Sequence, residues 1–191
     1  MMNCKELAID FLEIAEINLL MSIKDVKPEN ITKTPHPEMN PISWIFGHCV
    51  SHMDFLHSLF TDSNRFTEEQ RKYFTFGVDK DTIKAGFPFS FKEIIECYLD
   101  LSESCFKILK EFPEDKYDTI VSDKSKAENL FQNIQRISLH YMGHTGQIVM
   151  IRIALEGPNW SYVGGISKEL RKKYKNSWLK WWEENKSDYE C

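Results

Sequence analysis

The chain has 191 residues, of which 42% are hydrophobic, and its 24 Lys and Arg against 29 Asp and Glu leave a formal net charge of −5. A chain of this length can bury a core without disulfides, and its composition excludes a disordered protein. Since affinity for a phosphate backbone comes mainly from basic residues, the acidic balance also argues against a nucleic-acid partner.

Cysteine usage and hydropathy predict a cytoplasmic location. The five cysteines are odd in number and form no Cys-x-x-Cys motif, a pattern typical of free thiols in a reducing compartment. Charged residues interrupt the first 16 positions, so these do not resemble a signal peptide. No apolar run approaches the ~18 residues of a membrane span, and we expect no membrane association.

The first half of the chain predicts two long helices separated by a proline-rich linker. Apolar residues recur every three or four positions over residues 4–23, with Asn3 as the cap and Glu6 as its reciprocal partner. Residues 24–40 form the linker. Asn40-Pro41 then predicts a helix start, with Asn40 as the cap, and the helix continues to about residue 60.

Residues 61–89 show no sustained period and are rich in aromatic side chains. Thr67 and Gln70 predict a short capped helix over residues 68–74. A connection this long is usually functional or docked by its own side chains. We favour a plug of aromatic rings at one end of the fold, with a substrate lid as the alternative.

The second half predicts three more helices. Ser90 with Glu93 starts one that runs to about residue 110, and Ser125 with Glu128 starts another that runs to about residue 155 before Gly157-Pro158. After a loop at residues 164–165, a helix over 168–184 places Trp178, Trp181 and Trp182 on its apolar side. Together, the elements predict an all-α four-helix bundle, residues 4–155, with a C-terminal extension over 158–191, in one domain of residues 1–191.

Histidines are the candidate functional residues. His140 and His144 are four positions apart, so they share a helix face and can both reach one metal ion. His48 and His52 have the same spacing on the second helix, and either of them, or both, can complete the site. Because position 141 is Tyr rather than Glu, the pair is not that of a zinc protease. His57 is expected on the surface.

Two segments resemble the DinB/YfiT-like family. They are Asn40-Pro-Ile-Ser-Trp-Ile-Phe-Gly-His48 and His140-Tyr-Met-Gly-His144-Thr-Gly-Gln147, and the resemblance covers about residues 4–155. It implies a four-helix bundle, a frequent homodimer, and one divalent transition metal, Zn or Ni, held by His48, His140 and His144. Some members of that family are S-transferases that use a low-molecular-weight thiol.

A three-histidine site leaves an open coordination position, which is typical of catalytic metal sites. We therefore expect a metal-dependent transferase or hydrolase acting on a small electrophile, with a low-molecular-weight thiol as a possible second substrate. Gln147 is a candidate to orient a ligand, or else a helix-packing amide, and no acid–base residue is evident. The alternative is a non-enzymatic, stress-related dimeric or metal-binding module. DNA binding, a third hypothesis, conflicts with the acidic charge.

Overall fold

The computed structural model describes residues 3–61, 63–125, 127–158 and 167–190, and in this part of the chain every regular element is a helix. The long helices are α1 (Cys4–Ile23), α2 (Ile42–Ser58), α5 (Phe91–Glu111), α6 (Leu130–Glu156) and α7 (Lys168–Asn185). Two short helices, α3 (Glu68–Tyr73) and α4 (Lys80–Lys84), lie in the aromatic segment. Four single 3-10 turns complete the order, η1 (Pro28–Asn30), η2 (Glu114–Lys116), η3 (Asp123–Ser125) and η4 (Lys186–Tyr189).

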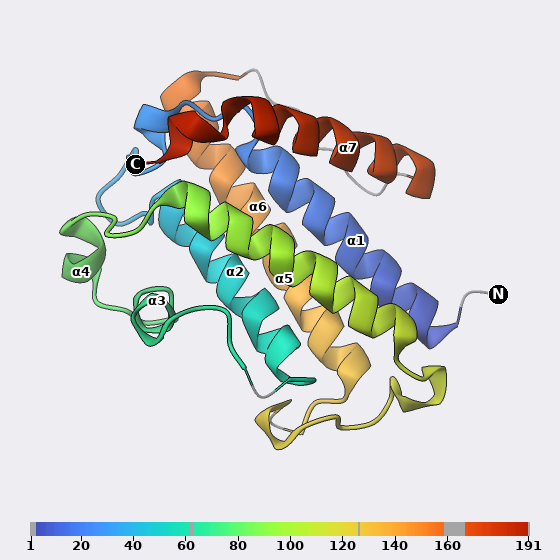
Figure 1. The fold of residues 1–191 in the computed structure, drawn as a ribbon. Coiled ribbons are helices and arrows are strands. Elements are labelled where there is room, and N and C mark those ends of the chain that lie inside the picture. Colours follow the sequence, from blue (N-terminus) through green and yellow to red (C-terminus); the bar gives the residue numbers. More distant parts are fainter. Residues whose placement is uncertain (1–2, 62, 126, 159–166, 191) are drawn as a thin grey trace.

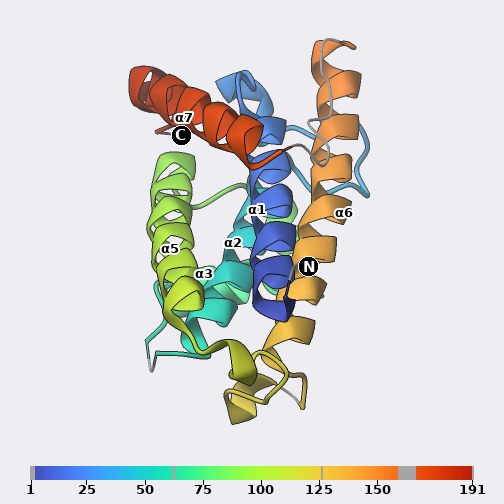
Figure 2. The same cartoon turned by 90° about the vertical axis from the view of Figure 1, so that its right-hand side faces the viewer.

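Helices α1, α2, α5 and α6 run side by side (Figure 1). Helix α1 packs mainly against α6, and α2 packs against both α5 and α6. Helix α7 crosses one end of this group and rests on α1 (Figure 2). Its Trp178 and Trp182 are buried, and Trp178 Nε1 donates to the Leu20 carbonyl at 2.7 Å. The C-terminal extension is therefore packed into the same core as α1.

Capping side chains begin most of the helices where the sequence predicts. Asn3 with Glu6 and Thr67 with Gln70 form complete capping boxes. The prediction that Asn40 caps α2 is wrong, because Pro41 occupies the N-cap position. The Asn40 side chain instead accepts a hydrogen bond from Lys80 Nζ at 2.8 Å, which ties the linker to α4.

The predicted start of α6 is also wrong. The helix begins at Leu130, where Asn129 and Gln132 form the capping box, whereas Ser125 ends the 3-10 turn η3. Ala127 has a φ of 69°, a left-handed conformation that interrupts any helix between Ser125 and Asn129. The far end agrees with prediction, since Gly157 follows α6 with a φ of 93°. The loop expected at residues 164–165 lies outside the described residues.

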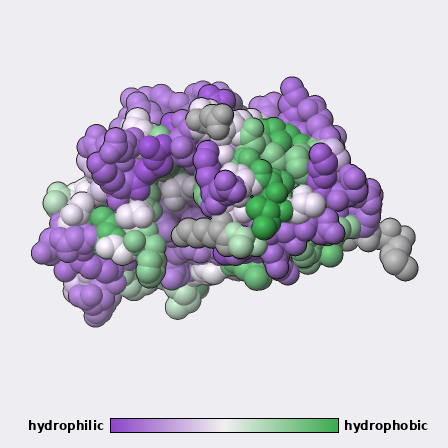
Figure 3. All heavy atoms as spheres, turned by 90° about the horizontal axis from the view of Figure 1, so that it is seen from below, coloured by the Kyte–Doolittle hydropathy of each residue, from purple (hydrophilic) through white to green (hydrophobic). Residues whose placement is uncertain are grey.

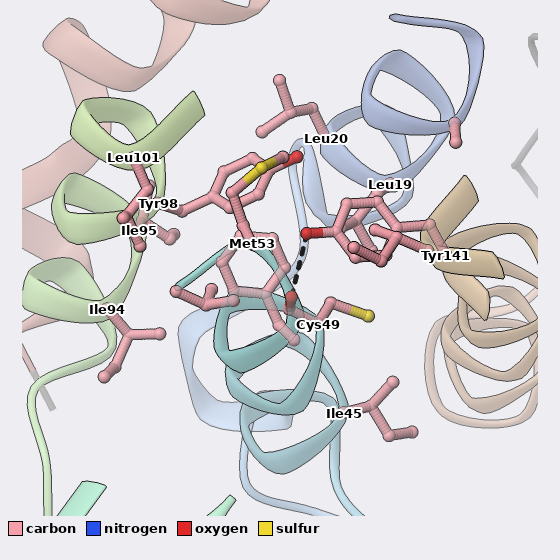
Figure 4. Close-up of a cluster of buried hydrophobic side chains, with 14 of the residues drawn as sticks. Leu19, Leu20, Ile45, Cys49, Met53, Ile94, Ile95, Tyr98, Leu101 and Tyr141 are labelled. Atoms are coloured by element: carbon pink, nitrogen blue, oxygen red, sulfur yellow. Dashed lines mark hydrogen bonds between the residues drawn. The ribbon is translucent and has the colours of Figure 1, made fainter. Parts of the chain in front are cut away.

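The core lies where α1, α2, α5 and α6 face one another. Leu19 and Leu20 of α1, Met53 of α2 and Tyr98 of α5 meet there, all fully buried (Figure 4). The outer surface differs from this interior: seen from below, it is largely hydrophilic, with the strongest hydrophobic patch to the right of its middle and smaller ones at the left and along the lower edge (Figure 3). Among the described residues, no helix is long and apolar enough to span a membrane.

Candidate metal centre

Helices α2 and α6 each contribute two histidines to one cluster. The four residues, called here the histidine cluster, are His48 and His52 of α2 and His140 and His144 of α6. A spacing of four places each pair on one face of its helix, and the two faces meet because α2 packs against α6. The structure thus places the three predicted ligands and the alternative, His52, in one cluster. Among the described residues, the group whose nitrogens lie close enough to hold one ion is His48, His52 and His140, which includes the alternative and leaves out His144.

One hydrogen bond aligns the two helices beside the cluster. Tyr141 Oη donates to the Cys49 carbonyl at 2.9 Å, in the buried interior between α2 and α6 (Figure 4). Tyr141 follows His140 in the chain and Cys49 follows His48. The bond therefore sets the register in which the two pairs of imidazoles meet.

The imidazole rings lie close enough to share one ion. Ring centroids are 5.0 Å apart for His48 and His140, 5.1 Å for His48 and His144, 4.0 Å for His52 and His140, and 4.3 Å for His140 and His144. One nitrogen from each of His48, His52 and His140 lies within 4.8 Å of the other two, so these three residues could hold a metal ion. With Zn–N bonds of ~2.0–2.1 Å, two nitrogens of a tetrahedral site lie about 3.4 Å apart. Small side-chain rotations would bring nitrogens from the 4.8 Å limit to this distance.

The aromatic segment orients His48. Its Nδ1 lies 2.6 Å from the Phe74 carbonyl, and because a carbonyl can only accept, the proton of the neutral ring sits on Nδ1. The Nε2 lone pair then remains for a metal. One turn earlier, Trp44 Nε1 donates to the Tyr73 carbonyl at 2.9 Å, and the Trp44 ring stacks on His48 with centroids 4.9 Å apart. These contacts give a physical reason for the Trp-x-x-x-His spacing.

Gly47 lets the aromatic segment approach α2 this closely. A Cβ atom added at Gly47 would collide with the ring of Phe74, which is itself fully buried. The absence of a side chain at this position therefore allows the Phe74 carbonyl to reach His48. Of the aromatic rings predicted to plug one end of the fold, Phe66, Tyr73 and Phe74 are buried, whereas Phe76 is 91% exposed.

On α6, the two histidines have different surroundings. The Nε2 atom of His140 is buried and has no hydrogen-bond partner among the described residues, which is costly unless another ligand occupies it. His144 Nδ1 donates to Gln147 Oε1 at 2.8 Å, which leaves its Nε2 lone pair available. Gln147, a candidate to orient a ligand or else a helix-packing amide, therefore contacts a histidine of the cluster.

Burial keeps the cluster neutral. It lowers the pKa of His52 to about 3, with further lowering from His140, His48 and the Arg136 guanidinium. Burial likewise lowers the pKa of His140 to about 3, followed by the effects of His144, His48 and Arg136. The pKa values of His48 and His144 are also lowered, again mainly by burial. Neutral imidazoles are the form that binds metals.

A surface pocket of about 580 Å³ opens beside the cluster. His48 and His52 line it together with the exposed rim residue Phe76. An ion pair between Arg136 and Glu128 forms another part of the wall, with Nε and Oε2 2.9 Å apart. A small molecule can therefore reach His48 and His52 from solvent, whereas His140 and His144 do not line this pocket.

His57 does not belong to the cluster, and the prediction that it is exposed is wrong. Only 3% of its surface is accessible. Its Nε2 contacts Ser104 Oγ and its Nδ1 contacts Thr61 Oγ1, both at 3.1 Å. The contact with α5 buries the ring, and no local sequence pattern indicated that contact.

A family profile supports a relationship over most of the chain. The profile of DUF1572, described as a protein of unknown function, matches residues 11–169. The chain belongs to this family. Comparisons with curated proteins and with solved structures gave no match. In this DUF1572 member, the matched region contains all of α2 and α6, and with them the whole histidine cluster.

Sequence reasoning missed the parts of the site that come from distant segments. The Phe74 carbonyl left no signal, because backbone atoms are the same in every residue. Glu128 was interpreted as a helix-capping residue, whereas it pairs with Arg136 at the pocket. The eight-residue separation of this pair spans the actual helix start at Leu130 and became visible only once that start was known.

Proposed function

We propose that this DUF1572 protein is a DinB/YfiT-like four-helix bundle that uses one divalent transition metal, Zn or Ni, in a transferase or hydrolase reaction on a small electrophile. The observation that carries the proposal is the buried Nε2 of His140, which has no hydrogen-bond partner among the described residues, next to the nitrogens of His48 and His52. A buried nitrogen lone pair without a donor is well explained by a metal ligand.

The donor set fits a metal of this class. Neutral imidazoles suit Zn and Ni, and His48 and His144 each have their Nδ1 proton held by an oxygen acceptor. Such outer hydrogen bonds fix the tautomer and the ring orientation of metal-binding histidines. We propose His48, His140 and His144 as the ligands, as the family resemblance implies, with Gln147 orienting His144. His52 is the alternative third ligand that the geometry offers.

The pocket favours an enzyme over the non-enzymatic alternative. A purely structural metal site is closed, whereas His48 and His52 line a pocket that small molecules can enter. A divalent ion held by three protein ligands would supply Lewis acidity beside this pocket, on the side lined by His48. The phenylalanine rings of the wall reduce water around a bound electrophile, and the polar residues of the wall can position a low-molecular-weight thiol.

Metal analysis of the purified protein tests the proposal. After growth with added Zn and Ni, we expect about one equivalent of transition metal per chain, and a loss of this metal in His140→Gln with the fold retained by circular dichroism. Less than about 0.1 equivalent in the wild-type protein, together with no uptake of added Zn²⁺ by the metal-free protein, would overturn it.

We also propose a homodimer that buries the outer face of α6, which lies along one edge of the molecule (Figure 2). Leu139 and Met150 on this face are 68% and 61% exposed. None of the exposed residues of α6 is charged, and depletion of charged residues is typical of interface cores. The exposed residues are Gln132, Gln135, Leu139, Gly143, Gln147, Met150, Ile153 and Ala154. Light scattering should show a dimer for the wild-type chain and a monomer for Leu139→Glu; a monomeric wild type would contradict this.

A further inference from the structure

The polar part of the pocket wall contains an arginine whose guanidinium is held by hydrogen bonds at Nε and Nη2 but makes none to a described residue at Nη1. Arg136 lies on α6 one turn before His140, and it lines the same pocket as His48 and His52. Its side chain is 41% exposed, so a molecule in the pocket can reach it.

Three contacts orient the Arg136 guanidinium. Nε donates to Oε1 and Oε2 of Glu128 at 3.1 and 2.9 Å, and Nη2 donates to Asn133 Oδ1 at 3.1 Å. The guanidinium carbon lies 5.6 Å from the centroid of the Phe55 ring. Nη1 makes no hydrogen bond to any described residue. The guanidinium is therefore pre-organised, with its Nη1 amino group, called here the free arm, left for a ligand.

The charges and hydroxyl groups of the pocket favour an anion at this arm. Glu128 is the only carboxylate among the described residues that line the pocket, and it is matched by Arg136. The proposed divalent ion would therefore make the pocket positive overall. Ser125, which also lines it, is 1% exposed and its buried Oγ has no hydrogen-bond partner among the described residues, so this hydroxyl can donate to a bound oxygen.

The remaining walls are apolar and aromatic. Phe55, Phe74 and Phe76 line the pocket, and the Phe76 ring at its rim is almost fully exposed. When an apolar ligand covers such an exposed ring, apolar surface is removed from water, and this favours binding of the ligand. The volume of about 580 Å³ is that of a site for a small organic molecule.

We infer that the pocket binds a small organic anion, with a carboxylate on the free arm of Arg136 and an apolar body against Phe55 and Phe76, and that Glu128 is the counter-ion that holds Arg136 before binding. This inference deepens the proposed function, since it names the substrate class of the same site. Arg136 is then a specificity-determining residue of the pocket.

Benzoate is a suitable probe, with benzyl alcohol as its uncharged control. Calorimetric titration of the Zn-loaded and the metal-free protein measures both ligands, and the visible spectrum of the Co²⁺-loaded protein reports events at the histidines. We expect benzoate to bind the wild-type protein in both forms, and benzyl alcohol to bind at least ~10-fold more weakly, since a charge-assisted hydrogen bond is lost.

Opposite effects of two variants make the test specific. Arg136→Gln should weaken benzoate binding by roughly 10–100-fold, and Arg136→Lys by less, because lysine keeps the charge without the planar fork. Glu128→Gln should tighten benzoate binding, because the amide oxygen can still accept from Arg136 Nε and keep the guanidinium oriented, while the competing negative charge is removed. If the pair only stabilises the fold, both variants would weaken binding alike, and this result would overturn the inference, as would equal binding of benzyl alcohol.

The double variant Glu128→Gln with Arg136→Gln controls for an unpaired charge. It should fold as the wild type does and still bind benzoate weakly; wild-type affinity in this variant would overturn the inference. Failure of the proposed function is distinguishable, since absence of Co²⁺ binding with Arg136-dependent benzoate binding would contradict only the metal. Conversely, Co²⁺ bound at the histidines with benzoate affinity unchanged in Arg136→Gln would contradict only the inference.

Discussion

Tyr141 Oη donates to the Cys49 carbonyl, and each residue is the chain neighbour of a histidine in the cluster. Both residues are fully buried, so this bond is made in an environment without competing water. It connects the hydrophobic core to the candidate metal centre, because the alignment of α2 with α6 determines which imidazole nitrogens can meet.

Removing this bond should affect both stability and metal binding. Tyr141→Phe leaves the ring in place and deletes only the hydroxyl, so we expect a loss of about 1 kcal/mol in the free energy of unfolding, measured by urea denaturation. Zn²⁺ affinity should also fall, because the register of the two helices is less restricted.

Tyr117→Phe is the matched control. The Tyr117 hydroxyl donates to the Leu109 carbonyl at 2.6 Å, also in the buried interior but away from the cluster. This variant should lose a similar stability and keep the wild-type Zn²⁺ affinity. Equal Zn²⁺ affinity in both variants would contradict a role for Tyr141 in aligning the site.

Single substitutions in the histidine cluster should identify the ligands. His48→Gln and His140→Gln should each weaken Zn²⁺ binding by at least ~100-fold, which exceeds the usual cost of losing an outer-shell contact. Of His52→Gln and His144→Gln, the variant that loses more Zn²⁺ affinity identifies the third ligand. Competition with a chromophoric chelator measures the Zn²⁺ affinity of all four variants. His57→Gln, a buried histidine outside the cluster, should keep wild-type affinity.

Two glycine substitutions should have opposite effects on stability. Gly47→Ala places a Cβ atom against the Phe74 ring, and overpacking of this kind costs roughly 1–3 kcal/mol. Gly143→Ala meets no atom within 4 Å and should stabilise helix α6 by up to ~1 kcal/mol. Thermal or urea unfolding compares the two; equal effects would show that Phe74 does not rest on Gly47.

The metal-free protein should lose stability in acid. His52 and His140 have pKa values of about 3 in the folded chain, below the ordinary 6.5 expected when unfolded. Between these values, the unfolded chain binds more protons, so the free energy of unfolding falls as the pH falls from 6.5 toward 3. Urea unfolding of chelator-treated protein at several pH values measures the slope. His52→Asn should make it shallower by about one proton, and an unchanged slope would contradict the burial of His52 as a neutral ring.

The sequence by itself determined most helix boundaries and the two histidine pairs. Capping boxes such as Asn3 with Glu6, and the i, i+4 spacing of His140 and His144, depend on residues within one turn, and such interactions form wherever those residues occur. The start of α6 was missed because two Asn or Ser caps compete within five residues, and the left-handed backbone at Ala127 selects the second.

Only the tertiary structure decided what surrounds the histidines. The Phe74 carbonyl reaches His48 from 26 positions away, and His57 is buried by Ser104 from 47 positions away. Such contacts depend on helix register and on how a loop docks, which short-range patterns do not encode. The tertiary structure placed His52 in the cluster beside His140. It also placed the ion pair of Glu128 and Arg136 in the wall of the pocket, together with residues of α2.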